Sequence, residues 1–293
     1  MNHASETRQY MLESNNAKNM TTSDFIVTNT RNRYHLIPYI GNKSGFADIF
    51  DVLMPDVTGR RIYDLFGGGG SFSVYCCYKF GSENVTYNDN NPVITNFIKS
   101  VRDHTVELLD EYEKHRELSS EKYYYTIRQK DNLETGVAGA GRFLYLAKNA
   151  FSGKIRFNRL NKFNAPMRKN SRCPNIDREL FMNTSKIIQN MEIRNEMYES
   201  YRNVSDAFLY MDPPYMNNPN WHYNSVPKTA DFVDFVRTVG VNNLIMISEQ
   251  NHPESLKLPS HYNTYSIKLN RSLQYFTQKN SQEFIITNYP KSQ

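Results

Sequence analysis

The sequence predicts an α/β protein built on a doubly wound sheet of seven strands, with a mostly helical domain inserted between two parts of that sheet. Two observations support this fold. Short apolar runs alternate with segments of helical periodicity near both ends of the chain, as in a largely parallel sheet covered by helices. A charged, tyrosine-rich stretch separates these two regions. The predicted strands are residues 61–66, 84–89, 191–195, 207–211, 243–248, 263–269 and 283–288.

The first βαβ unit has the clearest local pattern. Strand 61–66 runs directly into the four glycines 67–70, a helix follows, and strand 84–89 ends in Asp89. Pro92 stands in the first turn of the next predicted helix, where its missing N–H is tolerated. A strand, a glycine-rich turn, a helix and a second strand with a terminal acid are typical of the opening unit of a doubly wound sheet.

Three parts of the chain differ in composition. Residues 1–33 are rich in Asn, Thr and Ser, so we expect a flexible tail there rather than a functional arm. Residues 34–95 and 189–293 carry the strand pattern and form the predicted sheet domain. The insert is residues 96–188, with helical spacing in 104–130, 142–150 and 176–189 and turn formers in 151–175.

Composition limits the class of protein. No apolar run approaches the roughly 18 residues of a membrane span, and the N-terminus has no signal-peptide apolar region. The three cysteines lack disulfide or zinc spacing, and the seven histidines are scattered. These features predict a cytoplasmic protein that needs no metal. We expect a monomer or weak dimer.

Positive charge is concentrated in the insert. Residues 142–178 hold ten lysines and arginines and a single acid, Asp177, within a chain of net charge +5. Phe151, Phe157 and Phe163 interleave with the basic residues. A basic stretch with aromatics favours a nucleic-acid surface. The alternative is a solvated basic face.

Asp212-Pro213-Pro214-Tyr215 is the most informative motif, because it follows the buried strand 207–211. Each proline removes a backbone N–H, so the turn presents mostly hydrogen-bond acceptors. The Asp212 carboxylate and the Pro213 carbonyl could accept the two N–H groups of an exocyclic amine, and the Tyr215 ring could stack on a base. The alternative is a structural strand-to-turn junction.

Two further motifs suit a nucleotide-like ligand. The glycine turn lets a ligand approach the backbone beside a helix N-terminus, and Asp89 could accept from ribose hydroxyls. As an alternative, Asp89 caps a turn or helix. Upstream, residues 39–43 offer an aromatic ring and Lys43, which could pair a ligand carboxylate or remain solvated.

These motifs, in this order, resemble the Dam-type (D12 class) DNA adenine-N6 methyltransferases, and the phage enzymes of that family most of all. The resemblance covers about residues 34–293 and implies a Rossmann-like methyltransferase sheet with a DNA-recognition insert. Residues 39–43, 64–69 and 88–91 look like the opening, 151–158 and 163–166 like the target-recognition hairpin, 212–215 like the catalytic motif and 283–289 like the closing strand.

The resemblance implies S-adenosyl-L-methionine as cofactor, double-stranded DNA as partner and a bacterial or phage-infected cell as setting. The implied catalytic residues are Asp212, Pro213, Pro214 and Tyr215. The implied cofactor contacts are Tyr39, Lys43, Asp64, Phe66, Gly67, Gly69, Asp89, Tyr198 and Asp212. The implied DNA contacts are Lys154, Arg156, Asn158, Pro166, Arg168 and Asn170.

Departures from the family pattern concern the target site. Lys154 replaces an apolar residue, and Pro38 and Asn170 replace basic, base-reading residues, so GATC or a related short site is expected. A methyltransferase acting on RNA or on a protein amide is the enzymatic alternative. A catalytically silent DNA-binding protein on the same scaffold is the other alternative.

Overall fold

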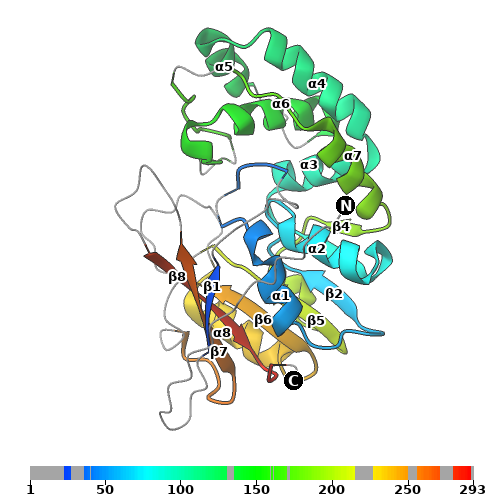
Figure 1. The fold of residues 1–293 in the computed structure, drawn as a ribbon, viewed down its shortest axis with the longest axis vertical. Coiled ribbons are helices and arrows are strands. Elements are labelled where there is room, and N and C mark those ends of the chain that lie inside the picture. Colours follow the sequence, from blue (N-terminus) through cyan, green and yellow to red (C-terminus); the bar gives the residue numbers. More distant parts are fainter. Residues whose placement is uncertain are drawn as a thin grey trace, which may run out of the picture.

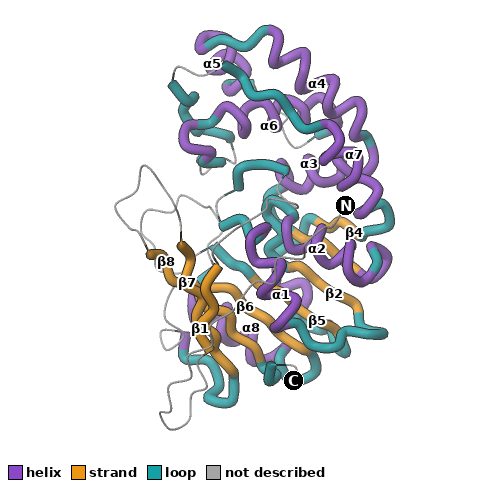
Figure 2. The backbone as a smooth tube through the Cα atoms, viewed as in Figure 1, coloured by secondary structure: helices purple, strands orange, loops and turns teal. Residues whose placement is uncertain are grey.

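A computed structural model describes residues 23–27, 36–39, 41–130, 135–158, 160, 162–169, 172–214, 227–249, 256–270 and 280–291. Figure 1 shows two regions, a sheet with flanking helices below and a group of helices above. The strands gather in the lower region and helices dominate the upper one (Figure 2). This is the α/β architecture with a helical insert that the sequence predicts. None of the helices in the described ranges is long and apolar enough to cross a membrane.

All seven predicted strands are present. Within the described residues an eight-stranded sheet has the order β1-β7-β8-β6-β5-β2-β3-β4. Every neighbouring pair is parallel except those made by β8, which runs antiparallel to β6 and β7. The strands are β1 (Ser23–Val27), β2 (Arg61–Asp64), β3 (Val85–Asn88), β4 (Glu192–Arg194), β5 (Ala207–Met211), β6 (Leu244–Glu249), β7 (Asn263–Asn270) and β8 (Asn280–Thr287).

The extra strand corrects one expectation. β1 lies within residues 1–33, which the sequence predicts to be a flexible tail, yet Ser23–Val27 pair in parallel with Tyr265–Leu269 of β7. Strand β7 would otherwise be the sheet edge, with unpaired N–H and C=O groups that readily take another strand. Pairing with an edge is a long-range contact, which local composition does not reveal.

Helices cover both faces of the sheet and explain why its central strand is uniformly apolar. Phe208 and Tyr210 of β5 belong to the core on the side of α1 (Ala47–Leu53) and α2 (Ser71–Phe80). Leu209 and Met211 belong to the core on the side of α8 (Thr229–Val239). Because successive side chains of a strand point to opposite faces, a strand buried on both faces reads as a continuous apolar run.

The insert is a helical layer that shares its core with the sheet domain. It contains α4 (Thr105–Glu117), α5 (Glu121–Arg128), α6 (Gly136–Asn149) and α7 (Arg178–Ile187). Helices α4, α6 and α7 pack on α3 (Pro92–Asp103), and α5 packs on α6. Rings of Phe97, Phe143 and Phe181 from α3, α6 and α7 meet at centroid distances of 5.6 and 6.4 Å. The predicted boundary at residue 96 therefore falls inside α3, a helix that packs on both regions.

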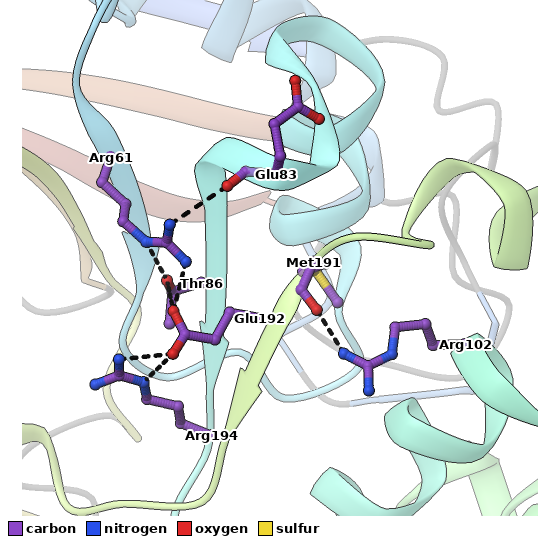
Figure 3. Close-up of polar contacts among 7 residues, drawn as sticks. All are labelled: Arg61, Glu83, Thr86, Arg102, Met191, Glu192 and Arg194. Atoms are coloured by element: carbon purple, nitrogen blue, oxygen red, sulfur yellow. Dashed lines mark hydrogen bonds and ion pairs between the residues drawn. The ribbon is translucent and has the colours of Figure 1, made fainter.

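A polar network ties together the three strands at one side of the sheet (Figure 3). The Arg61 guanidinium of β2 donates to Thr86 Oγ1 of β3 at 3.0 Å and pairs with Glu192 of β4. Glu192 also accepts from Arg194 at 2.6 Å. Since Arg61, Thr86 and Glu192 stand near the starts of their strands, this network lies at the amino ends and leaves the carboxyl ends free for a site.

Candidate functional site

Predicted catalytic and cofactor-binding residues from distant parts of the chain, among them Asp64, Asp89 and Asp212, lie at the carboxyl ends of β2, β3 and β5. Strand β2 lies between β5 and β3, so the connection order of the sheet reverses at the β2–β5 pair. Ligands of open α/β sheets bind in the crevice outside such a reversal. Asp64 and Tyr210 are direct partners across it, and Asp212 follows two residues later. Residues far apart in the chain are thus brought to one edge.

Asp212 is held by a buried lysine. Lys43 Nζ lies 2.7 Å from Asp212 Oδ2 and 2.9 Å from the Gly41 carbonyl oxygen. The same ammonium lies 2.9 Å from Glu283 Oε1 on β8. The side chains of Lys43 and Glu283 are each 3% exposed, whereas that of Asp212 is 18% exposed. Lys43 is therefore engaged with protein acceptors and is not a solvated surface lysine.

The surroundings of Asp212 raise its pKa to about 6, chiefly through burial, against the lowering effect of Lys43. Glu283 adds to the increase because it places a second negative charge nearby. Lys43 lies on Oδ2, and the described residues make no hydrogen bond to the other carboxylate oxygen. Pro213 is buried and Pro214 is half-buried after it. Tyr215, the fourth residue of the motif, lies outside the described residues.

The glycine turn is shaped by two tyrosine rings. An added Cβ at Gly67 would lie 2.2 Å from the Tyr87 ring, and one at Gly68 would lie 2.6 Å from the Tyr39 ring. Gly68 also has a φ of +48°, and the Tyr87 hydroxyl donates to its carbonyl at 2.9 Å. The glycines are therefore required by close packing of the loop, and Tyr39, whose cofactor contact stays a prediction, lies directly against the turn. Gly69 meets the same ring, with an added Cβ at 3.0 Å.

Asp89 organises the same turn from the end of β3. Its two carboxylate oxygens accept from the backbone N–H groups of Gly68 at 2.9 Å and Asn91 at 2.8 Å. Burial raises the pKa of Asp89, while these hydrogen bonds oppose the increase. The N-cap of α3 is Asn91, which accepts from Val93. Asp89 therefore braces the glycine turn and caps the turn at Asn91, while Asn91 caps the helix; a ribose contact of Asp89 stays a prediction.

Asp64 lies deeper than the other carboxylates. It is 1% exposed, and its Oδ2 accepts from Ser73 Oγ of α2 at 2.6 Å. Within the described residues its Oδ1 has no hydrogen-bond partner. Burial raises the pKa of Asp64 to about 7, and the charges of Asp212 and Asp89 contribute. Asp64 thus lies beneath the glycine turn, not on a surface open to a cofactor.

An aromatic pair flanks the turn on the α8 side. The rings of Phe66 and Tyr198 are 5.4 Å apart, and both contact Phe232 of α8. Asn88 holds this segment in place, because its Nδ2 donates to the Leu65 carbonyl and its Oδ1 accepts from the Glu196 N–H at 2.9 Å. The Tyr198 hydroxyl is buried without a hydrogen-bond partner in the part of the chain described. Phe66 and Tyr198, two of the predicted cofactor contacts, therefore lie next to each other.

The predicted recognition hairpin forms at residues 150–167. It contains antiparallel bridges between Ala150 and Met167 and between Phe157 and Phe163. Phe157 and Phe163 are 4% and 3% exposed and pack against Phe143 of α6, so they anchor the hairpin and do not contribute to a nucleic-acid surface. The aromatic part of the sequence argument for DNA binding is wrong for these two rings.

The polar side chains of the hairpin alternate with its buried ones. Arg156 is exposed, and its guanidinium donates to the side chain and carbonyl of Asn164 at 2.9 and 3.1 Å. Asn158 accepts from the N–H groups of Leu160 and Lys162, which shapes the hairpin end. Lys154 and Pro166 are exposed, and Arg168 is half-buried and donates to the Arg172 carbonyl. Asn170 lies outside the described residues.

The hairpin lies next to the segment that covers the glycine turn. An added Cβ at Gly153 would be 2.9 Å from Pro38 Cβ, and Pro38 directly precedes Tyr39. Pro38 and the hairpin, which the sequence groups together only through the family resemblance, are therefore neighbours in space.

Three residues of the site are given no role by the sequence analysis. Glu283 and Asn88 are buried at 2% and 1% exposure, and each joins segments far apart in the chain. Asn42 accepts from Ser44 N and Ser71 Oγ, and its buried Nδ2 has no hydrogen-bond partner in the described part of the chain. A charged or amide residue at the border of an apolar strand is the signal that could have identified Glu283 and Asn88.

Comparison with known proteins identifies the family. The model of the D12 class N6 adenine-specific DNA methyltransferases matches residues 39–283. The chain therefore belongs to this family, and it is an adenine-specific DNA methyltransferase. The match spans the sheet domain and the insert, and it includes Tyr39, Asp212 and Glu283.

The relatives are Type II methyltransferases. M1.LlaDCHI of Lactococcus lactis subsp. cremoris is 23% identical over 284 residues, covering 88% of this chain and 98% of that protein. M.MjaIII of Methanocaldococcus jannaschii is 25% identical over 191 residues, or 61% of this chain and 63% of its own length. M.CviBI of Paramecium bursaria Chlorella virus NC1A is 26% identical over 185 residues, or 61% and 68%. These names support a connection with restriction-modification.

Proposed function

We propose that this enzyme transfers a methyl group from S-adenosyl-L-methionine to N6 of an adenine flipped out of a short DNA site, with GATC as the leading candidate. The observation that carries the proposal is the position of Asp212. This carboxylate stands at the end of β5 beside the reversal of the sheet, with Lys43 on one oxygen and the other oxygen available.

The residues at the site fit S-adenosyl-L-methionine. Asn42 has a buried amide donor without a described partner, which suits the carboxylate of an amino acid. Phe66 and Tyr198 offer apolar rings for an adenine, and the Tyr198 hydroxyl is a second buried group without a described partner. Asp89 provides carboxylate oxygens for ribose hydroxyls. When bound, the cofactor supplies a methyl group on a positively charged sulfur.

Lys43 receives a different role from the one the family resemblance implies. Among the described residues its ammonium already donates to Gly41 and Asp212, and it forms an ion pair with Glu283. We therefore assign Lys43 to holding Asp212, and Asn42 to the cofactor carboxylate. Asp64 supports the glycine turn from below, since it is buried against Ser73.

The protein's contribution to the reaction is to hold the amine. The N6 lone pair of adenine is delocalised into the ring, so the amine is a poor nucleophile until its geometry changes. Asp212 and the Pro213 carbonyl accept the two N–H bonds and favour a pyramidal nitrogen, and Tyr215 stacks on the base. Bound S-adenosyl-L-methionine would supply the methyl group for a new N–C bond and would keep the C–S electron pair on sulfur, and the surplus proton of N6 would leave afterwards. Positioning of this kind can supply most of the acceleration.

The target base has to leave the duplex, because N6 cannot reach Asp212 from within the stack. The hairpin at residues 150–167 supplies groups that can hold and read the DNA, with Arg156 exposed on its surface. Lys154, Pro38 and Asn170 are the positions at which the site can differ from GATC. We place the enzyme in the cytoplasm as a monomer or weak dimer.

A methyl-transfer assay with labelled S-adenosyl-L-methionine tests the proposal on duplex DNA, RNA and protein. We expect transfer to duplex DNA, and Asp212→Ala should lower kcat by about a hundredfold or more while duplex binding is kept. The matched control is Asp234→Ala, because Asp234 is an acid on α8 whose side chain is 69% exposed. Transfer to RNA or protein alone would select the enzymatic alternative, and DNA binding without transfer would select the silent scaffold.

Sequencing of N6-methyladenine in cells that express the chain determines the site. Methylation confined to GATC would show that the three departures do not change recognition. A different short motif would assign the change to Lys154, Pro38 or Asn170, and each reversion could then be tested separately.

A further inference from the structure

Glu283 is a buried acid at the site to which the proposed reaction gives no role. It lies on β8, which pairs with β6, and β6 pairs with β5, the strand that leads to Asp212. Glu283 is 2% exposed, and its Oε1 lies 2.9 Å from Lys43 Nζ. The ammonium therefore lies between Glu283 and Asp212.

This arrangement is electrostatically unusual for a structural ion pair. Burial of a carboxylate costs several kcal/mol, which a single buried ion pair often fails to offset. Here two carboxylates share one ammonium, so the three side chains carry one net negative charge when both acids are ionised. That charge is adjacent to the oxygen of Asp212 that is available to the amine.

We propose that Glu283 is a positioning residue for Asp212, acting through Lys43. By holding the ammonium from the opposite side, Glu283 fixes Asp212 Oδ2 and directs the other oxygen at the amine. It also keeps the cluster negative where positive charge develops on the nitrogen during methyl transfer. The inference rests on the proposed function, because it concerns the same amine.

The effect on pH dependence has a definite sign. The described groups that shift the pKa of Asp212 are Lys43 before α1 and Glu283 on β8, and the charge of Asp212 in turn raises the pKa values of Asp64 on β2 and Tyr210 on β5. Glu283 raises the pKa of Asp212, and it also competes for Lys43. Neutralising Glu283 removes both effects, so the pKa of Asp212 should fall. The acidic limb of the kcat profile should then move to lower pH.

The test compares Glu283→Gln with wild type over pH 5 to 9, at saturating cofactor and DNA. We expect kcat at pH 8 to fall about tenfold or more, an acidic limb moved down by about half a pH unit, and a cofactor Kd changed less than about twofold. Glu283→Asp keeps the negative charge. It should therefore recover part of the lost kcat, and the acidic limb of its kcat profile should lie at the wild-type pH. The matched control is Glu192→Gln, an acid paired with two arginines at the opposite end of the sheet (Figure 3).

A double-mutant cycle tests whether the effect passes through Lys43. If it does, Glu283→Gln combined with Lys43→Met should be no slower than Lys43→Met alone. Additive losses, or a Glu283→Gln enzyme with wild-type kcat and pH profile, would overturn the inference and leave the proposed function intact. If Glu283→Gln does not fold, the kcat–pH profile of Glu283→Asp tests the inference instead. This variant retains the negative charge, so an acidic limb that moves to lower pH would refute the inference. Failure of the wild type to methylate adenine would instead refute the proposed function.

Discussion

Replacement of Asp64 by asparagine should stabilise the enzyme at alkaline pH and leave it unchanged in acid. Asp64 is 1% exposed, accepts from Ser73, and has a pKa of about 7 in place of the ordinary 3.8. When folding raises the pKa of a carboxyl group, the protonated group favours the folded state. This contribution to stability is complete at pH values below the pKa of the group in the unfolded chain. That contribution is lost as the pH rises from about 4 to about 7.

The magnitude follows from the two pKa values. A pKa near 7 against 3.8 corresponds to a loss of about 4 kcal/mol in the free energy of unfolding between acid and alkaline conditions. Asparagine has the same shape, can still accept from Ser73, and does not ionise. Asp64→Asn should therefore exceed wild type by about 2–4 kcal/mol at pH 8, after allowing about 1 kcal/mol for an altered hydrogen bond. Near pH 4 the two proteins should have similar stability.

Urea unfolding at intervals from pH 4.5 to 8.5 measures the effect, with both proteins analysed at a common slope. Asp234→Asn is the control, because its side chain is 69% exposed and its removal should leave the wild-type pH dependence unchanged. Stability curves of wild type and Asp64→Asn that stay parallel at all pH values would refute the reasoning. They would mean that Asp64 is ionised at little cost, through a partner or water in the native protein.

The remaining predictions concern the cofactor and DNA. Asp89→Ala should weaken S-adenosyl-L-methionine binding by about 1.5–3 kcal/mol, measured by calorimetric titration, because a charge-assisted bond is lost; an unchanged Kd would limit Asp89 to bracing Gly68. Arg156→Ala should relax recognition at one guanine beside the target by about 1–3 kcal/mol, measured on a panel of single-base variants; equal weakening at every site would make Arg156 a phosphate contact. DNA binding should fall steeply with salt, by about 0.9 in the log–log slope for each phosphate contact. Alanine at the exposed lysines 154 and 162 should flatten that slope, and a wild-type slope near zero would make the basic stretch a solvated face.

The fold could be predicted from the sequence because its signals are local. Apolar runs bounded by turns gave β2 to β8, and the glycine run before a helical pattern gave the first βαβ unit. Asp212 could be placed at a strand end for the same reason, since its motif follows Ala207–Met211 directly. A strand that is buried on both faces reads as a continuous apolar run, so it can be recognised in the sequence before its neighbouring strands are known.

Other features depend on which segments meet. Ser23–Val27 form a strand on the edge of β7, although the composition of residues 1–33 as a whole resembles a tail. Phe157 and Phe163 alternate with basic residues as an interface would, yet they are buried against α6. In both cases a long-range contact outweighed the local pattern.

The sequence by itself determined the sheet, the order of its motifs and the family chemistry at Asp212. Only the tertiary structure decided how the charges at that point are arranged. It placed Lys43 between Asp212 and Glu283, buried Asp64 under the glycine turn, and turned Asp89 toward Gly68. The physical reason is that pKa and ion pairing depend on burial and on distances of a few ångströms, which residues 169 positions apart in the chain acquire only when the strands assemble.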